Sequence, residues 1–233
     1  MKIIEAKQID VNKFTAQHSA FFVRIDPEDL SLSVLEILQD LANLSWLNTF
    51  DRESVKNSFK SRATKTCDDI KCKLVDANTN TPLIDEAGEY IVSCLAKKAL
   101  VSVYAHKDIP LAELLGRKIS NNPGFDFYTE KDGLLTAGEA KYIKGVNAYN
   151  SSLSQVNKFI SKKKHIDDLA LLFFFVPDES LDNMNKGNFS IGAAFSVTDI
   201  ETEKLIMNIL KNNAFEKTIQ NHSIFLLAVN MYE

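Results

Sequence analysis

The segment GFDFYTEKDGLLTAGEAKY, residues 124–142, constrains the fold of this chain more than any other stretch. Apolar and aromatic residues lie on both sides of the polar sequence Lys131–Asp132–Gly133, and β-prone runs separated by a short turn are typical of a hairpin. The segment therefore predicts two adjacent antiparallel strands, the first starting near residue 126 and the second ending near residue 141.

Three charged residues stand out in this hairpin: Asp126, Glu139 and Lys141. Side chains alternate faces along a strand, so Glu139 and Lys141 share a face, and antiparallel pairing can bring Asp126 beside Glu139. Two converging carboxylates are hard oxygen ligands for Mg²⁺ or Mn²⁺. A lysine beside such an ion can orient or deprotonate a water, or stabilise charge on a phosphate. The set predicts metal-dependent hydrolysis of a phosphodiester.

A purely structural interpretation competes with this one. The pattern of an acid, any residue and a lysine also occurs at residues 5–7 and 69–71. Only the copy at 139–141 follows a strand that carries an acid, and only this copy precedes a predicted helix. The alternative is a surface hairpin with a cross-strand salt bridge, which would contribute little to stability.

The rest of the chain alternates helical and β-prone patterns, which predicts an α/β fold with a mixed sheet flanked by helices. We expect a small α+β region over residues 1–80 and the main domain over 81–233. The run at 168–177 is apolar and ends at a proline, so it predicts a buried central strand, with its three phenylalanines in the core rather than on a base-stacking surface. The expected strands are 19–26, 70–77, the hairpin, 168–177 and 223–232, and the expected helices are 27–50, 51–64, 84–105, 146–164 and 201–215.

Composition narrows the function classes. The formal net charge is −4, which argues against broad non-specific binding to nucleic acid but leaves room for a local basic groove. The chain has three cysteines, a low and odd number that suits a reducing compartment. No apolar run has the length of a secretory signal or a membrane span, so we expect a cytoplasmic protein without a membrane partner.

The block PGFDFYTEKDGLLTAGEAKY, with EAGEYIVSCL upstream, resembles the PD-(D/E)XK nuclease superfamily. More specifically, it looks like the corresponding block of the HamA-type nuclease subunits of Hachiman anti-phage defence and of related Abp defence proteins. The resemblance implies a restriction-endonuclease-like fold over residues 81–233. It also implies that Asp126, Glu139 and the carbonyl of Ala140 bind the metal, that Lys141 is the catalytic lysine, and that Glu89 completes the site.

The same resemblance implies DNA as the substrate and a helicase as the protein partner, which would supply most of the DNA affinity. Two other functions stay open: a catalytically silent scaffold of the same fold, and a stand-alone restriction-type endonuclease. Within the site, Glu86 is the rival of Glu89 for the acid on the upstream helix.

Basic residues after and before the hairpin are candidate DNA contacts. Lys162, Lys163 and Lys164 end the helix predicted after the hairpin, where they could bind phosphates or simply favour a helix C-terminus electrostatically. Lys118, beside Arg117, precedes the hairpin and could reach a DNA backbone or lie in a solvated loop. On the helix after Lys141, Gln155 and Tyr149 are further candidates for the site.

Overall fold

The computed structural model describes residues 1–14, 17–79, 85–115 and 124–231. Seven described strands form one mixed sheet in the order β1-β2-β7-β6-β5-β4-β3. The strands are β1 (Lys2–Ile9), β2 (Ala20–Asp26), β3 (Lys107–Asp108), β4 (Phe127–Lys131), β5 (Leu134–Lys141), β6 (Ser190–Val197) and β7 (Ile224–Asn230). The pairs β2–β7, β7–β6 and β6–β5 are parallel, while β1–β2, β5–β4 and β4–β3 are antiparallel.

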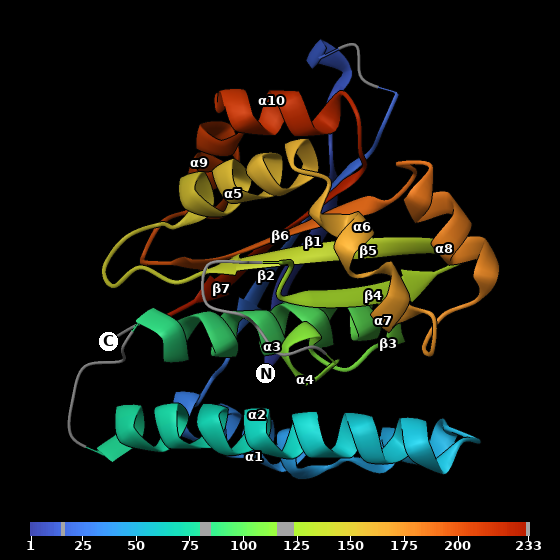
Figure 1. The fold of residues 1–233 in the computed structure, drawn as a ribbon. Coiled ribbons are helices and arrows are strands. Elements are labelled where there is room, and N and C mark those ends of the chain that lie inside the picture. The colour runs from blue at the N-terminus through green and yellow to red at the C-terminus, as the bar shows by residue number, and fades with distance from the viewer. Residues whose placement is uncertain (15–16, 80–84, 116–123, 232–233) are drawn as a thin grey trace.

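Helices cover both faces of the sheet (Figure 1). On one face lies α3 (Asp85–Tyr104), with α1 (Leu30–Ala42) and α2 (Glu53–Thr79) forming a further layer beyond it. On the other face lie α5 (Tyr149–Ser161), α9 (Thr202–Ile209) and α10 (Asn213–Ile219). The shorter elements are η1 (Asn12–Phe14), η2 (Ser45–Thr49), α4 (Ala112–Leu115), α6 (Lys164–Asp167), α7 (Leu169–Leu172) and α8 (Asp178–Asn185). This architecture confirms the predicted α/β class.

Each face of the sheet has its own hydrophobic core. Leu153 and Phe159 of α5 pack with Phe215 of α10 on one face, and Ile91 and Leu95 of α3 pack on the other. The central strands β6 and β7 are buried almost throughout, as expected for parallel strands covered on both faces. No helix of the described residues is long and apolar enough to cross a membrane.

Several predicted elements are confirmed, namely the strand near 20–26, the long helix near 85–104, the hairpin and the last strand. The expected strand at 70–77 is wrong, because these residues continue α2. The helical spacing of the buried residues explains this: Phe59, Ala63, Cys67, Ile70 and Leu74 recur every three or four positions and line one face.

The expected strand at 168–177 is also wrong. These residues form α7 and a turn, and the strand that takes the place beside β5 is β6. Leu172 is buried, whereas Phe173 and Phe174 are 58% and 40% exposed. A short apolar run without a clear period does not distinguish a strand from a helix, which is why the sequence was misleading here.

Two further departures lie near the two ends of the chain. The strand β1 was not predicted, and the region expected as one helix over 201–215 divides into α9 and α10. The boundary predicted between residues 80 and 81 lies outside the described residues. The strands β1 and β2 nevertheless belong to the common sheet, which they join through the pairing of β2 with β7.

Candidate active site

The β4–β5 hairpin is the scaffold of the candidate site. Its two-residue turn is Asp132–Gly133, with positive φ values of 51° and 78°, the conformation for which Asp-Gly is favoured. Phe127 pairs with Gly138 across the strands, and a Cβ on Gly138 would lie 2.1 Å from the Phe127 ring. The missing side chain of Gly138 therefore lets the ring lie flat on the sheet next to the charged end of β5.

Asp126 lies immediately before β4 and is held by two backbone hydrogen bonds. Its amide donates to the carbonyl of Gly138 at 2.8 Å, and its Oδ2 accepts from the amide of Ala140 at 2.8 Å. Backbone groups two residues apart in a strand point to the same side, so the carbonyl of Ala140 also faces the edge where β4 has ended. The carboxylate of Asp126 and this carbonyl are thus oxygen donors at the same place.

Lys141 joins two glutamates at the end of β5. Its Nζ lies 2.8 Å from Oε1 of Glu89 and 3.2 Å from Oε1 of Glu139. Glu139 is buried, with only 1% of its side chain exposed, whereas a third of the Glu89 side chain is exposed. These contacts bring Glu139, Lys141 and Glu89 of α3 into one group.

The electrostatics of the site keep Lys141 protonated. Burial alone would lower the pKa of Lys141, but nearby negative charges, led by that of Glu139 and followed by Glu89 and Asp126, raise it above its ordinary value. A lysine with a raised pKa is an ammonium at neutral pH, which suits it to stabilise negative charge.

Two packing contacts bring α3 and α5 to this end of β5. Gly88 lies against the buried ring of Tyr142, where a Cβ would come within 2.2 Å of the ring, so glycine is needed for α3 to approach and present Glu89. From the other face, Ser152 of α5 donates to the carbonyl of Glu139 at 3.1 Å. The Glu86 side chain lies outside the part of the chain that the structure describes.

A tyrosine and a fourth acid belong to the same region and were not predicted. The hydroxyl of Tyr128 donates to Oδ2 of Asp168 at 2.6 Å. Burial, followed by the charges of Asp168, Asp126 and Glu139, raises the pKa of Tyr128 well above its ordinary value. Tyr128 is two residues from Asp126, so strand alternation predicts that the two side chains lie on the same face of the sheet. Asp168 carried no such signal because its segment resembled a strand.

The donor atoms suit a hard divalent cation, but in this structure Lys141 contacts two of the carboxylates. Carboxylates and a carbonyl are the ligands that Mg²⁺ and Mn²⁺ prefer. Among the described residues, however, no three histidine, cysteine, aspartate or glutamate side chains form a group that could hold a metal ion. Glu89 and Glu139 share the ammonium of Lys141, and Asp126 accepts from the Ala140 amide.

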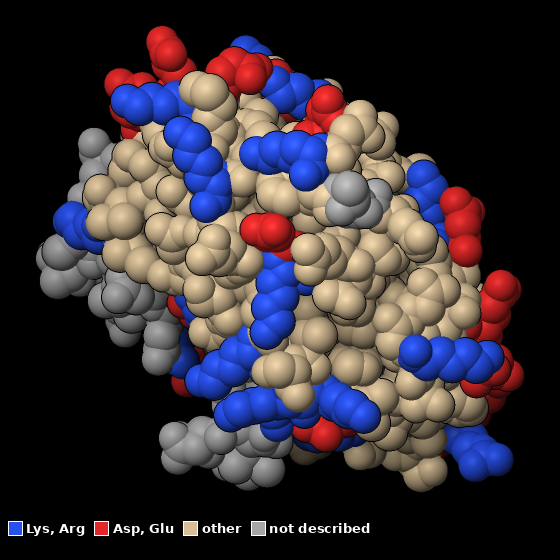
Figure 2. Space-filling model, turned by 90° about the horizontal axis from the view of Figure 1, so that it is seen from above, with Lys and Arg blue, Asp and Glu red and all other residues tan. Residues whose placement is uncertain are grey.

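The predicted basic cluster closes a helix. Lys162 is the C-cap of α5, and Lys163 has a left-handed φ of 53°. Lys164 forms an ion pair with Asp167 at 3.0 Å. Figure 2 shows the face formed by α5, α9 and α10, where lysine and arginine side chains alternate with neutral surface and have acidic side chains near them. Lys162 therefore lies at the end of α5, whereas Lys164 is the first residue of α6, and phosphate binding by the cluster stays a prediction.

The remaining candidates are placed as follows. Lys118 and Arg117 lie outside the described residues. Tyr149 packs edge-on against Phe195, with ring centroids 6.1 Å apart. Gln155 lies on α5 and is partly exposed.

Residues from α3, the hairpin, α5 and the junction of α6 and α7 thus meet at one end of β5. Comparison with protein-family models, with curated proteins and with solved structures found no match for this chain.

Proposed function

We propose that this protein is a metal-dependent nuclease that hydrolyses phosphodiester bonds in DNA at the end of β5. The observation that carries the proposal is that four charged side chains meet at one place, namely Glu89, Asp126, Glu139 and Lys141. Lys141 and Glu89 are 52 residues apart in sequence, so only the fold brings them together. Buried ion pairs contribute little net stability because desolvation opposes the attraction. A cluster of this kind is therefore better explained by chemistry than by folding.

Each residue then has a defined role. The carboxylates of Asp126 and Glu139 and the carbonyl of Ala140 would hold Mg²⁺ or Mn²⁺, with Glu89 as the outer acid. A bound ion supplies a polarised phosphoryl oxygen and a water of lowered pKa. Lys141, held as an ammonium, stabilises negative charge on the phosphate, and Glu89 orients its side chain.

The wider setting of this activity follows from the resemblance of the hairpin block. It supports a nuclease subunit of an anti-phage defence system that works with a helicase. The net charge of −4 agrees with a division of labour in which the partner supplies most of the affinity for DNA. A stand-alone restriction-type endonuclease would need basic elements that read base edges.

One observation favours a second candidate, a catalytically silent scaffold. Lys141 already contacts both glutamates, and the described residues hold no three-acid group fit for a metal. In a scaffold, Lys141 would be the permanent counter-ion of the two acids. The two candidates differ in whether the carboxylates bind a divalent cation.

The deciding experiment is calorimetric titration with Mn²⁺ together with a DNA-cleavage assay, with and without a helicase partner. Glu139→Gln should lose both Mn²⁺ binding and cleavage. Glu130→Gln is a matched control, because Glu130 is a buried acid of the same hairpin that bonds to the amide of Gly133 and the hydroxyl of Ser180 instead. Parental Mn²⁺ affinity in Glu139→Gln would reject the metal site and leave the scaffold.

A further inference from the structure

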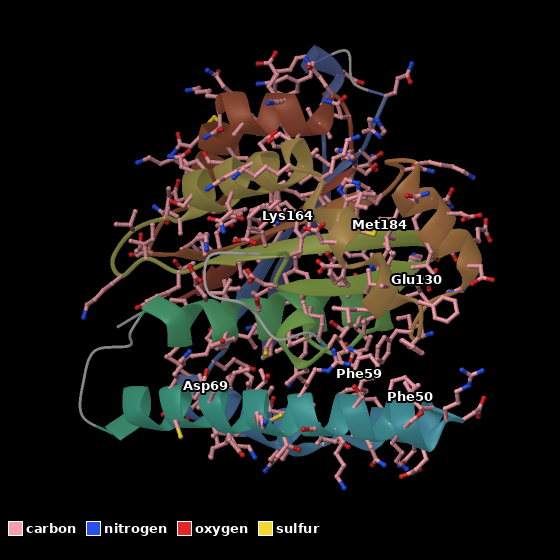
Figure 3. The ribbon with its side chains drawn as sticks, in the orientation of Figure 1. Phe50, Phe59, Asp69, Glu130, Lys164 and Met184 are labelled. Carbon is pink, nitrogen blue, oxygen red and sulfur yellow. The ribbon has the colours of Figure 1, made fainter. Side chains whose placement is uncertain are left out.

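Six aromatic side chains gather at the start of α2 and beside α7, and part of this aromatic cluster faces solvent. Phe50 and Phe59 stack with centroids 5.0 Å apart, and Phe174 packs edge-on against both at 5.5 Å. Figure 3 shows Phe50 and Phe59 together at the end of α2 nearest α7. The members are Trp46, Phe50, Phe59, Phe173, Phe174 and Phe175.

The outer part of the aromatic cluster is exposed to solvent. Phe173 is 58% exposed and Phe174 is 40% exposed, and their rings meet edge to face at 5.4 Å. The inner rings hold this pair in place, because Phe59 is buried and Phe174 rests on it. Two neighbouring phenylalanines with free faces on a rigid base form a surface on which flat groups can stack.

The flanks of this surface are basic although the chain as a whole is acidic. Residues 51–66 carry five basic and two acidic side chains, a net charge of +3, against −4 for the whole chain. The guanidinium of Arg62 lies over the ring of Phe59, 4.5 Å from its centroid. Lys56 is three residues before Phe59 and so lies on the same side of α2. On the sheet side, Lys107 donates to the carbonyl of Phe175 at 2.6 Å.

The aromatic cluster is also close to the candidate site along the chain. Asp168, which accepts from Tyr128 beside the site, immediately precedes α7, and Phe173 immediately follows α7. Five residues of helix rise by about 8 Å. Along the sheet, Lys107 pairs with Glu130 of β4. Glu130 is four residues after Asp126, a distance of about 14 Å in extended chain.

We propose that the aromatic cluster is a stacking platform for single-stranded nucleic acid, with Lys56, Arg62 and Lys107 as phosphate contacts. Bases of a single strand stack on exposed aromatic rings, and basic side chains beside them follow the backbone. An apolar protein partner would fit the two phenylalanines but would gain nothing from the cationic flanks. The inference rests on the proposed function, since it takes the substrate of the site to be nucleic acid.

Fluorescence anisotropy with a labelled single-stranded oligothymidylate, in EDTA to prevent cleavage, tests the platform. Phe173→Ala should weaken binding between about fivefold and a hundredfold, as loss of one stacked base does. Leu32→Ala is the control, because Leu32 on α1 is also 58% exposed and lies outside the cluster, and it should leave binding unchanged.

Two further variants separate stacking from simple apolar contact. Phe173→Tyr should keep parental affinity, whereas Phe173→Leu should behave like Phe173→Ala. Replacing Lys56 and Arg62 with glutamine removes two phosphate contacts. The slope of log affinity against log salt concentration should therefore become less negative by about 1.4, since each single-strand contact contributes about 0.7. A duplex of the same length should bind more weakly, because its bases already stack on each other.

The outcomes distinguish this inference from the proposed nuclease. If Phe173→Ala binds the strand as tightly as the parent while DNA is still cleaved, the platform is wrong and the nuclease stands. If the strand binds through Phe173 but Mn²⁺ never produces cleavage, the nuclease is wrong and the platform stands. Parental binding by Phe173→Leu, or self-association that Phe173→Ala abolishes with no strand binding by the parent, would overturn the platform in favour of a protein interface.

Discussion

Replacing Lys141 with alanine removes the cation that Glu139 and Glu89 share. Glu139 is only 1% exposed, so without Lys141 its charge remains buried and loses its ammonium contact at 3.2 Å. Breaking a buried ion pair by removing one partner costs roughly 3–5 kcal/mol. We expect the lower end, about 3 kcal/mol, because a third of the Glu89 side chain is exposed and can turn to solvent.

A divalent cation should reverse this loss if the site binds one. Mn²⁺ at a hundredfold excess over its dissociation constant would stabilise the folded state by about 2.7 kcal/mol. Lys141→Ala should therefore be strongly destabilised in EDTA and largely restored by Mn²⁺, while its DNA cleavage remains abolished. A loss of about 3 kcal/mol lowers the melting temperature of a domain of this size by about 6–12 °C.

The assay is urea and thermal unfolding followed by circular dichroism, with EDTA or with Mn²⁺. Lys97→Ala is the control, because Lys97 pairs with Asp108, which is 64% exposed, and donates to the carbonyl of Ile109 at 2.8 Å. Its removal leaves no charge buried, so it should cost less stability than the removal of Lys141. If Lys141→Ala unfolds at the parental midpoint in EDTA, Lys141 is not the counter-ion that the contacts indicate. If Mn²⁺ stabilises neither parent nor variant, the carboxylates do not form a metal site.

Three further predictions follow from contacts of α3 and of the β4–β5 hairpin. Gly88→Ala should cost about 1–3 kcal/mol and reduce cleavage, because the new Cβ meets the ring of Tyr142 at 2.2 Å; unchanged unfolding and activity would show that α3 can shift freely. Burial lowers the pKa of His106 in the folded protein to about 4, from an ordinary value of 6.5. The contribution of neutral His106 to the free energy of unfolding is therefore complete above pH 6.5 and is lost at about 1.4 kcal/mol per pH unit as the pH falls towards 4. His106→Asn should flatten this acid limb in urea titrations, and an unchanged limb would assign it to other groups. Tyr128→Phe takes the 2.6 Å donor from Asp168 and should destabilise by about 1–3 kcal/mol, whereas parental stability would mean that water replaces the hydroxyl.

Local sequence patterns predicted the parts of the fold that depend on near neighbours. The Asp132–Gly133 turn specified the hairpin, and the three- and four-residue spacing of apolar residues specified α3. The same local rules went wrong at 70–77 and 168–177, where β-prone residues lie in helices or turns. Burial of those residues depends on which element packs over them, and a short sequence window does not contain that information.

For the site, the sequence by itself determined that Glu139 and Lys141 share a face and that a hairpin brings Asp126 to them, because strand alternation and turn length are local. Only the tertiary structure decided that Lys141 reaches Glu89 on α3, that Tyr128 donates to Asp168, and that Phe173 and Phe174 lie exposed beside the basic start of α2. These contacts join residues far apart in the chain. They arise from the packing of helices on the sheet, which is a property of the whole core and not of any single segment.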